Sequence, residues 1–305
     1  HKNCREWWYA TGYLNDEAGN FYSFQFTLLH LGFRVCTPKV VMVALTDFQT
    51  GRHYYLQRTK LFSGEITVNE HRVACGGVAS VQKNTRGMDF ALRHKDFQLR
   101  LFANYGKGAF WHCDNGKLQM ALPQQKETTL YYSYPNMPCE GKLTLEGRTF
   151  SVKGKAWFDK QGGTYSLWKP QTHWEWFSLR FYDDEEMMLF SFPQSNYQDG
   201  TYITAAGTRE RLNDYQIKTT KEIIKNGYRW SSGWSLFVPG KKEERYTITP
   251  ILEGNMNFAY FEELCDIKNE NGESVGLCFV ELLPGVRNKL GGGNDMAKLF
   301  KSIEY

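Results

Sequence analysis

Short runs of alternating apolar and polar residues dominate the chain, and turn residues separate them. A period of two is typical of strands that bury one face. Glu146-Gly147-Arg148 lies between two such runs and signals a hairpin. The apolar run 40–46 is continuous, which indicates a strand buried on both faces. The alternating runs occupy residues 21–28, 97–102, 142–145, 149–152, 174–181, 187–192, 246–251 and 276–282.

Helical periodicity is scarce and is confined to residues 219–224 and 295–303. Many regularly spaced strands with almost no helix predict an all-β fold of sandwiches or barrels. The 305 residues suit two domains of about 150 each. No low-complexity linker separates two halves, so we expect the domains to pack closely, with the seam within residues 162–170.

Composition narrows the function classes. The net charge of +4 is modest and the basic residues are dispersed, which argues against a nucleic-acid partner. No apolar run approaches the roughly 20 residues that a transmembrane helix needs. We expect a soluble protein that is either exported, after removal of a signal peptide, or cytoplasmic. Aromatic residues reach 16%, more than a plain core requires, and this favours a hydrophobic ligand.

Several kinds of site are absent from the sequence. The seven cysteines form no C-x-x-C pair, which predicts reduced and mostly buried thiols. There is no G-x-S-x-G elbow and no Walker A loop. His173 and Glu175 would share a strand face, but no third metal ligand lies nearby. We therefore expect neither a metal nor a cofactor.

The segment Glu6-Trp7-Trp8-Tyr9 joins a carboxyl group to three large aromatic rings. On a strand, Trp7 and Tyr9 share one face, and Glu6 and Trp8 share the other. Burial beside indole rings would raise the pKa of Glu6 and make it a proton donor. The alternative is a Glu6 that pairs with an arginine or caps backbone amides.

Two further segments combine acids with rings. On an extended chain Trp157 and Asp159 share a face, which suits protonation of an alkene and stabilisation of the cation by a ring. The alternative is an Asp159 that closes a turn. In the segment 174–177, Trp174 and Trp176 share one face, which is either core or the wall of a cavity.

Taken together and in order, the aromatic and acidic segments resemble one known family. They are similar to the AttH-like, lipocalin-like proteins, which include carotenoid 1,2-hydratase and the fungal decalin-forming Diels–Alderases. Some homologues are labelled secreted hydrolases, but the chain shows no hydrolase machinery. Each match is weak alone, but the matches are collinear and span nearly the whole chain. The matching segments are Glu6-Trp7-Trp8-Tyr9-Ala10-Thr11-Gly12, Phe24-Gln25-Phe26-Thr27, Tyr131-Tyr132-Ser133-Tyr134-Pro135, the hairpin 141–152, Gly154-Lys155-Ala156-Trp157-Phe158-Asp159, Trp174-Glu175-Trp176-Phe177, Tyr260-Phe261-Glu262 and Gly276-Leu277-Cys278-Phe279-Val280-Glu281-Leu282.

The resemblance implies two tandem lipocalin-like β-barrel or sandwich domains, 1–168 and 169–305, with a ligand pocket at or near their junction. It implies an isoprenoid, polyene or polyketide-like ligand that is hydrated, isomerised or cyclised. Asp159 corresponds to the proton donor of the hydratase, with Trp157 as its cation-stabilising ring and Glu6 as the second candidate acid. The expected ligand-binding residues are Trp7, Trp8, Tyr9, Tyr132, Trp157, Gln161, Trp174, Trp176 and Glu262.

One departure from the family weakens the catalytic hypothesis. Many relatives continue the motif as Asp-His-Glu-Trp, whereas this chain reads Asp159-Lys160-Gln161-Gly162. Three hypotheses stay open. The chain is an enzyme that hydrates, isomerises or cyclises an alkene; a non-catalytic carrier of a lipid, isoprenoid or polyketide; or a structural protein without a pocket. The sequence does not indicate the oligomeric state.

Overall fold

The structure is a computed structural model that describes residues 5–32, 36–61, 65–120, 128–164, 173–241, 244–257, 260–283, 290 and 301–305. The described residues form strands and turns, and they include no helix that could span a membrane. The all-β prediction is confirmed. Every strand pairing between the described residues for which a register is defined is antiparallel, as alternating sequences with short turns favour.

The chain folds into two compact units, each of which takes residues from both halves of the sequence. Unit 1 comprises residues 1–110, 130–164 and 296–305, and unit 2 comprises 111–129 and 165–295. The division predicted from the sequence was continuous, with a boundary after residue 168. Hydrophobic periodicity locates strands but does not say which strands pair, so exchanged segments of this kind leave no local signal.

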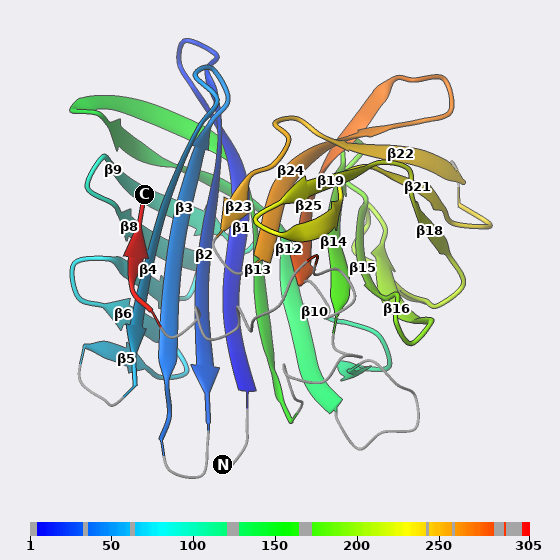
Figure 1. Cartoon of the computed structure of the whole chain (residues 1–305), viewed down its shortest axis with the longest axis horizontal. Coiled ribbons are helices and arrows are strands. Elements are labelled where there is room, and N and C mark those ends of the chain that lie inside the picture. The colour runs from blue at the N-terminus through cyan, green and yellow to red at the C-terminus, as the bar shows by residue number, and fades with distance from the viewer. Residues whose placement is uncertain are drawn as a thin grey trace. The chain divides into compact units, whose positions relative to one another are not determined.

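Unit 1 is built on one curled sheet in which most neighbouring strands are consecutive in the chain, the exceptions being β26–β4, β1–β13 and β12–β9 (Figure 1). The strand order is β26-β4-β3-β2-β1-β13-β12-β9-β8-β7-β6-β5. These strands are β1 (Arg5–Asp16), β2 (Phe21–Leu31), β3 (Lys39–Asp47), β4 (Arg52–Lys60), β5 (Ile66–Val68), β6 (Arg72–Cys75), β7 (Ala79–Lys83), β8 (Gly87–Arg93), β9 (Phe97–Asn104), β12 (Thr128–Leu145), β13 (Arg148–Gly163) and β26 (Ile303–Glu304).

One face of this sheet carries the hydrophobic core of unit 1. The pairing of β1 with β13 sets Ala10 opposite Phe158, and β1 with β2 sets Trp8 opposite Leu28. Residues opposite each other in an antiparallel pair point to the same face. All four belong to one buried apolar cluster, which we call the inner face of unit 1. The alternate residues of the same strands therefore point to the other face.

The predicted hairpin between β12 and β13 is confirmed. Glu146 and Gly147 form its loop with φ of 48° and 80°, the left-handed pair that a type I′ hairpin turn requires. The helix predicted at 219–224 is wrong, because a strand ends at Thr219 and another runs from Glu222 to Lys225. Most of the second predicted helix, at 295–303, lies outside the described residues.

Unit 2 is also a curled antiparallel sheet, with the order β17-β16-β15-β14-β25-β24-β22-β21-β18. Its core contains Phe177, Leu179, Trp234 and Val280. The remaining strands of the chain are β10 (Phe110–Trp111), β11 (Lys117–Gln119), β14 (Trp174–Phe181), β15 (Glu186–Phe192), β16 (Tyr197–Ile203), β17 (Arg209–Leu212), β18 (Gln216–Thr219), β19 (Glu222–Lys225), β20 (Tyr228–Ser231), β21 (Trp234–Phe237), β22 (Arg245–Pro250), β23 (Met256–Asn257), β24 (Tyr260–Lys268) and β25 (Ser274–Leu283).

A glycine in β13 permits the close approach of β1. A Cβ atom at Gly154 would lie 1.8 Å from the carbonyl oxygen of Tyr13, so Gly154→Ala forces the two strands apart. Overpacking of this kind destabilises a protein by about 1–3 kcal/mol. We predict a loss of at least about 2 kcal/mol in the free energy of unfolding, measured by urea denaturation.

Gly162→Ala, on the same strand, is the matched control. Its Cβ would lie 3.5 Å from the nearest atom, an ordinary contact, so its stability should stay within about 0.5 kcal/mol of the parent. Equal losses in the two variants would contradict this explanation of Gly154.

Candidate functional site

Over β1, β2, β12 and β13, the second face of the unit 1 sheet carries a buried and mostly polar set of side chains. The register places Tyr9 opposite both Asp159 and Thr27, so the three side chains share one face. A buried sheet face is normally apolar, because each buried polar group needs a partner. We call this set the polar face of unit 1: Tyr9, Thr11, Gln25, Thr27, Tyr131, Ser133, Trp157 and Asp159, all buried.

Asp159 is the acid at the centre of this face, and three side chains donate hydrogen bonds to it. The hydroxyl of Tyr131 lies 2.9 Å from Oδ2. The indole nitrogen of Trp157 lies 2.5 Å from Oδ1, which also accepts a hydrogen bond from the hydroxyl of Ser133. Asp159 is 5% exposed, so these donors replace the water that a carboxylate would otherwise bind.

The types of donor restrict where a proton on Asp159 can reside. An indole N–H can only donate, so Oδ1 must remain an acceptor. A hydroxyl can donate or accept, so a proton on Oδ2 can be shared with the phenol of Tyr131. Burial favours the neutral acid, whereas the three donors favour the carboxylate.

Two further predicted residues lie at the end of the same face. Trp7 pairs in register with Gln161, and both are partly exposed, unlike the buried Tyr9 and Asp159 further along. The structure thus brings Trp7, Tyr9, Gln161 and Asp159 to one face, which extends from buried positions to a partly exposed end.

Glu6 points to the opposite, inner face and makes contacts that hold it ionised. It accepts hydrogen bonds from Lys160 and, at 3.0 Å, from the indole of Trp8, and its Oε2 lies 3.8 Å from His30 Nδ1. His30, then Lys160 and Trp8, lower the pKa of Glu6 against the opposing effect of burial. A raised pKa is therefore wrong for Glu6, which is paired as the alternative expected, although with Lys160 and His30 instead of an arginine.

Trp8 and Tyr132 also lie away from the polar face. Trp8 is fully buried in the inner apolar cluster and packs edge-on against Phe158, with ring centroids 5.9 Å apart. Tyr132 accepts a hydrogen bond from Lys83. The eleven predicted site residues are therefore divided between two faces of unit 1 and the sheet of unit 2.

In unit 2, Trp174, Trp176 and Glu262 share a face. The register sets Trp176 and Glu262 each opposite Glu281, and the indole of Trp174 donates to Glu281 at 2.7 Å. Glu175 points to the other face and accepts hydrogen bonds from Ser231 at 2.7 Å and Trp234 at 3.1 Å. Burial raises the pKa of Glu175 above its ordinary value. Both faces of β14 are buried.

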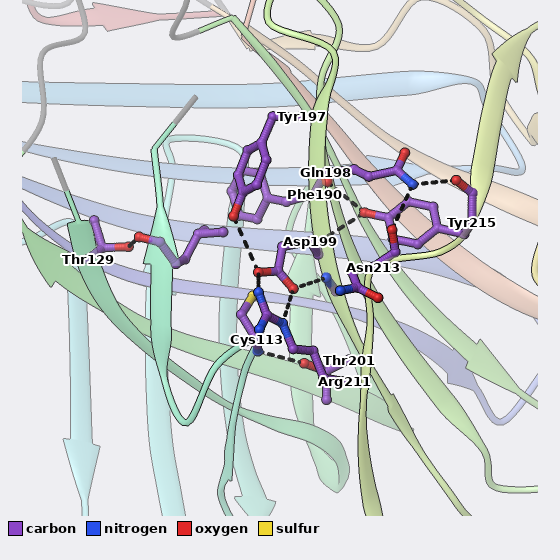
Figure 2. Close-up of polar contacts among 12 residues, drawn as sticks. Cys113, Thr129, Phe190, Tyr197, Gln198, Asp199, Thr201, Arg211, Asn213 and Tyr215 are labelled. Atoms are coloured by element: carbon purple, nitrogen blue, oxygen red, sulfur yellow. Dashed lines mark hydrogen bonds and ion pairs between the residues drawn. The ribbon is translucent and has the colours of Figure 1, made fainter. Parts of the chain in front are cut away.

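An ion pair fixes the edge of unit 2 on the same face as Trp176. Asp199, 1% exposed, accepts hydrogen bonds from Arg211 Nε at 3.0 Å and Nη2 at 2.7 Å, and from Tyr197 at 3.3 Å (Figure 2). Tyr215 donates to the backbone oxygens of Phe190 and Asp199. A bidentate arginine of this kind satisfies the carboxylate, so we assign the cluster a structural role.

Two groups of polar residues around the candidate site were not predicted. Tyr131 and Ser133 lie two residues apart in the segment 131–135 that resembles the family. This spacing puts them on one strand face and could have predicted that they act together. His30, Lys83 and Arg211 gave no local signal, because strand pairing brings them to their partners from 10 or more residues away. Among the residues that the structure describes, no three histidine, cysteine, aspartate or glutamate side chains are grouped to hold a metal ion.

The fold and this site define an all-β protein of two lipocalin-like units, with a buried acid on a polar sheet face. Residues 1–285 match the model of the AttH-like family, and the chain belongs to that family. No curated protein sequence matches the chain.

Two solved structures share the fold. An AttH protein from Nitrosomonas europaea superposes with a TM-score of 0.83 at 18% identity, covering 92% of this chain and 93% of that one. Kievitone hydratase from Nectria haematococca superposes with a TM-score of 0.72 at 16% identity, covering 91% and 88%.

A buried carboxyl in unit 2 makes stability depend on pH. Burial raises the pKa of Glu263 from 4.5 to about 8, although its Oε1 accepts the amide hydrogen of Gly254 at 2.6 Å. Between these values the folded state holds a proton on Glu263 that the unfolded state has lost, so the contribution of Glu263 to stability falls as pH rises from about 4.5 to about 8. Burial lowers the pKa of His112 and His173, which acts in the opposite direction, so the effect of Glu263 is the difference between variants. We predict that Glu263→Gln becomes more stable relative to the parent protein as pH rises, as urea midpoints at about pH 5, 6, 7 and 8 would show.

Glu253→Gln is the control for this prediction, because Glu253 is largely exposed and its pKa is lowered by Lys221. Its stability relative to the parent protein should stay nearly constant over the same pH values. Parallel stability curves for the parent and Glu263→Gln would show that Glu263 does not carry the effect.

Proposed function

We propose that the chain is an enzyme that adds water across a carbon–carbon double bond of a hydrophobic compound, with Asp159 transferring the proton. The observation that carries the proposal is the buried Asp159 carboxyl with its three donors on the polar face of unit 1. Membership of the AttH-like family and the fold shared with a hydratase support it.

The hydration begins with a proton transfer from Asp159 Oδ2 to one alkene carbon. The π electrons form the C–H bond, and the other carbon becomes a cation that aromatic rings such as those of Tyr9 and Trp157 can stabilise. The hydrogen bonds from Tyr131, Ser133 and Trp157 strengthen as the carboxylate forms. They therefore stabilise the transition state more than the ground state, which is what catalysis requires.

Water then completes the addition. Its oxygen attacks the cation, the carboxylate of Asp159 accepts the proton that water loses, and the acid is restored. The same first step, followed by loss of a proton from a neighbouring carbon or by ring closure, would give isomerisation or cyclisation. We propose an isoprenoid, polyene or polyketide-like substrate, since the site lies among aromatic residues.

This chain has Lys160 and Gln161 where many relatives have His and Glu, and the two positions lie on opposite faces of the unit 1 sheet. Adjacent residues on a strand point to opposite faces, so Lys160 lies on the inner face with Glu6, away from Asp159. Only Gln161 shares the face of Asp159. Replacing a histidine by Lys160 therefore leaves the three donors of Asp159 in place, which supports the enzyme over the alternative of a non-catalytic carrier.

The test is turnover of kievitone and a panel of isoprenoid and polyene alkenes, followed by liquid chromatography and mass spectrometry. In D2O a hydrated product gains one carbon-bound deuterium. We predict that Asp159→Asn lowers turnover by about 10²- to 10⁴-fold, because the variant cannot supply the proton. Its affinity for the compound should stay within a few-fold.

Two variants sharpen this test. Tyr131→Phe removes one donor of about 1.5 kcal/mol and should slow turnover by about tenfold. Asp89→Asn, at an exposed position of β8, is the matched control and should turn over normally. Normal turnover by Asp159→Asn would end the assignment, and retention of an unchanged compound by the parent protein would establish a carrier instead.

A further inference from the structure

Two lysines share one indole ring on the inner face of unit 1, opposite the face of Asp159. Lys83 Nζ lies 4.8 Å from the centroid of the Trp8 ring, and Lys160 Nζ lies 5.0 Å from it. Lys83 ends β7 and Lys160 lies near the end of β13, so strands far apart in the sheet order supply the two amines. We call these residues the lysine pair.

The two amines have different partners. Lys160 is ion-paired with Glu6, which keeps it charged. Lys83 donates a hydrogen bond to the hydroxyl of Tyr132 at 2.9 Å, and among the described residues no carboxylate lies within 4 Å of its nitrogen. Its other close neighbours are rings, with the Phe158 centroid at 5.1 Å and the Tyr132 centroid at 5.5 Å.

Because Lys160 has a carboxylate partner and Lys83 has a phenol, Lys83 is the amine that loses its proton more readily. A cation in apolar surroundings without a counterion is destabilised, and a second cation nearby adds repulsion. Burial, and then the charge of Lys160, lower the pKa of Lys83 from 10.5 to about 8. The cation–π attraction of the rings favours the charged form of Lys83, but Lys83 and Lys160 share the one indole ring of Trp8. Lys83 is partly exposed, so a small molecule can reach it from solvent.

Tyr132 has the properties of a proton donor to a ligand at Lys83. Burial raises its pKa to about 12, so the phenol remains protonated at neutral pH. When Lys83 is a neutral amine, the same contact can reverse, with the phenol donating. A nucleophilic nitrogen and an O–H group thus lie side by side against an aromatic surface.

We propose that Lys83 is a nucleophile that condenses with the carbonyl group of an apolar aldehyde or ketone, with Tyr132 as the proton-transferring group. The nitrogen lone pair forms the C–N bond, and the carbonyl π electrons move to oxygen, which takes the proton of Tyr132. The phenolate recovers a proton from the nitrogen. The nitrogen lone pair then forms the C=N bond as the C–O bond breaks, and the proton of Tyr132 lets the hydroxyl leave as water. The phenolate takes the last N–H proton, and an imine joins Lys83 to the ligand.

The site is separate from the proposed hydration chemistry, because adjacent residues of β1 and β13 point to opposite faces. Its test therefore does not depend on turnover. The folded protein is treated at about pH 7 with butanal and cyanoborohydride, which reduces an imine to a stable secondary amine. Peptide mass spectrometry then gives the rate of modification of every lysine side chain.

We expect Lys83 to be modified at least about tenfold faster than exposed lysines. About a tenth of an amine with a pKa near 8 is neutral at pH 7, against less than about 0.1% at an ordinary pKa of about 10.4. Lys160→Met should slow the reaction of Lys83, because it removes the repulsion and releases Glu6 to pair with Lys83. Tyr132→Phe should slow trapping of butanal several-fold but leave acetylation by acetic anhydride unchanged.

A second measurement avoids dependence on the size of the reagent. Reductive methylation with ¹³C-formaldehyde labels the lysines for NMR, and the titration of each signal gives its pKa. Lys83 should titrate near 8, well below the ordinary lysine value of about 10.4. Modification of Lys83 at the rate of exposed lysines, or its titration above 10, would overturn the proposal. Asp159→Asn should be labelled like the parent protein.

Discussion

The antiparallel pairing of β1 with β13 is the constraint on which both sites of unit 1 depend. Because successive side chains of a strand alternate between faces, this one register sets Tyr9 beside Asp159 and turns Trp8 and Lys160 to the inner face. A shift by one residue would exchange the two faces and bury Lys160 among the donors of Asp159. Gly154 preserves the register by allowing the strands to approach.

Burial then determines what each acid can do. Asp159 is buried with neutral donors, which stabilise a carboxylate without fixing its charge. Glu6 is half-buried with a lysine, which fixes its charge. The two acids come from the same pair of strands but have different partners, uncharged donors for Asp159 and a lysine for Glu6. The same contrast separates Lys160, which has a carboxylate partner, from Lys83, which has a phenol.

The sequence predicted the parts of this arrangement that depend on near neighbours. Alternation located the strands, Glu146-Gly147 located a hairpin, and the two-residue spacing put Trp157 and Asp159 on one face. It did not predict the partners that sheet pairing supplies. The donor Tyr131 is 28 residues from Asp159, and Lys160 is 154 residues from Glu6. The sequence left open whether Glu6 has a raised pKa or a basic partner, because its local segment contains rings but neither His30 nor Lys160.

The helix predicted at 219–224 fails for a related reason. Its short apolar periodicity could fit either element, and the tight turn at Asn226-Gly227, with φ of 52° and 77°, joins β19 to β20 as a hairpin. The exchange of segments between the two units is likewise a property of pairing. Local periodicity therefore predicted the strands. The polar contacts of the candidate site depend on long-range strand pairing, which local periodicity does not reveal.

The central claim is that the polar face around Asp159 is where the double bond reacts. The most direct measurement is a crystal structure of Asp159→Asn soaked with an alkene that the parent protein hydrates. The account predicts that an alkene carbon lies against the side chain of residue 159, on the face shared with Tyr9 and Tyr131. An alkene bound elsewhere, with the polar face free of ligand, would contradict it.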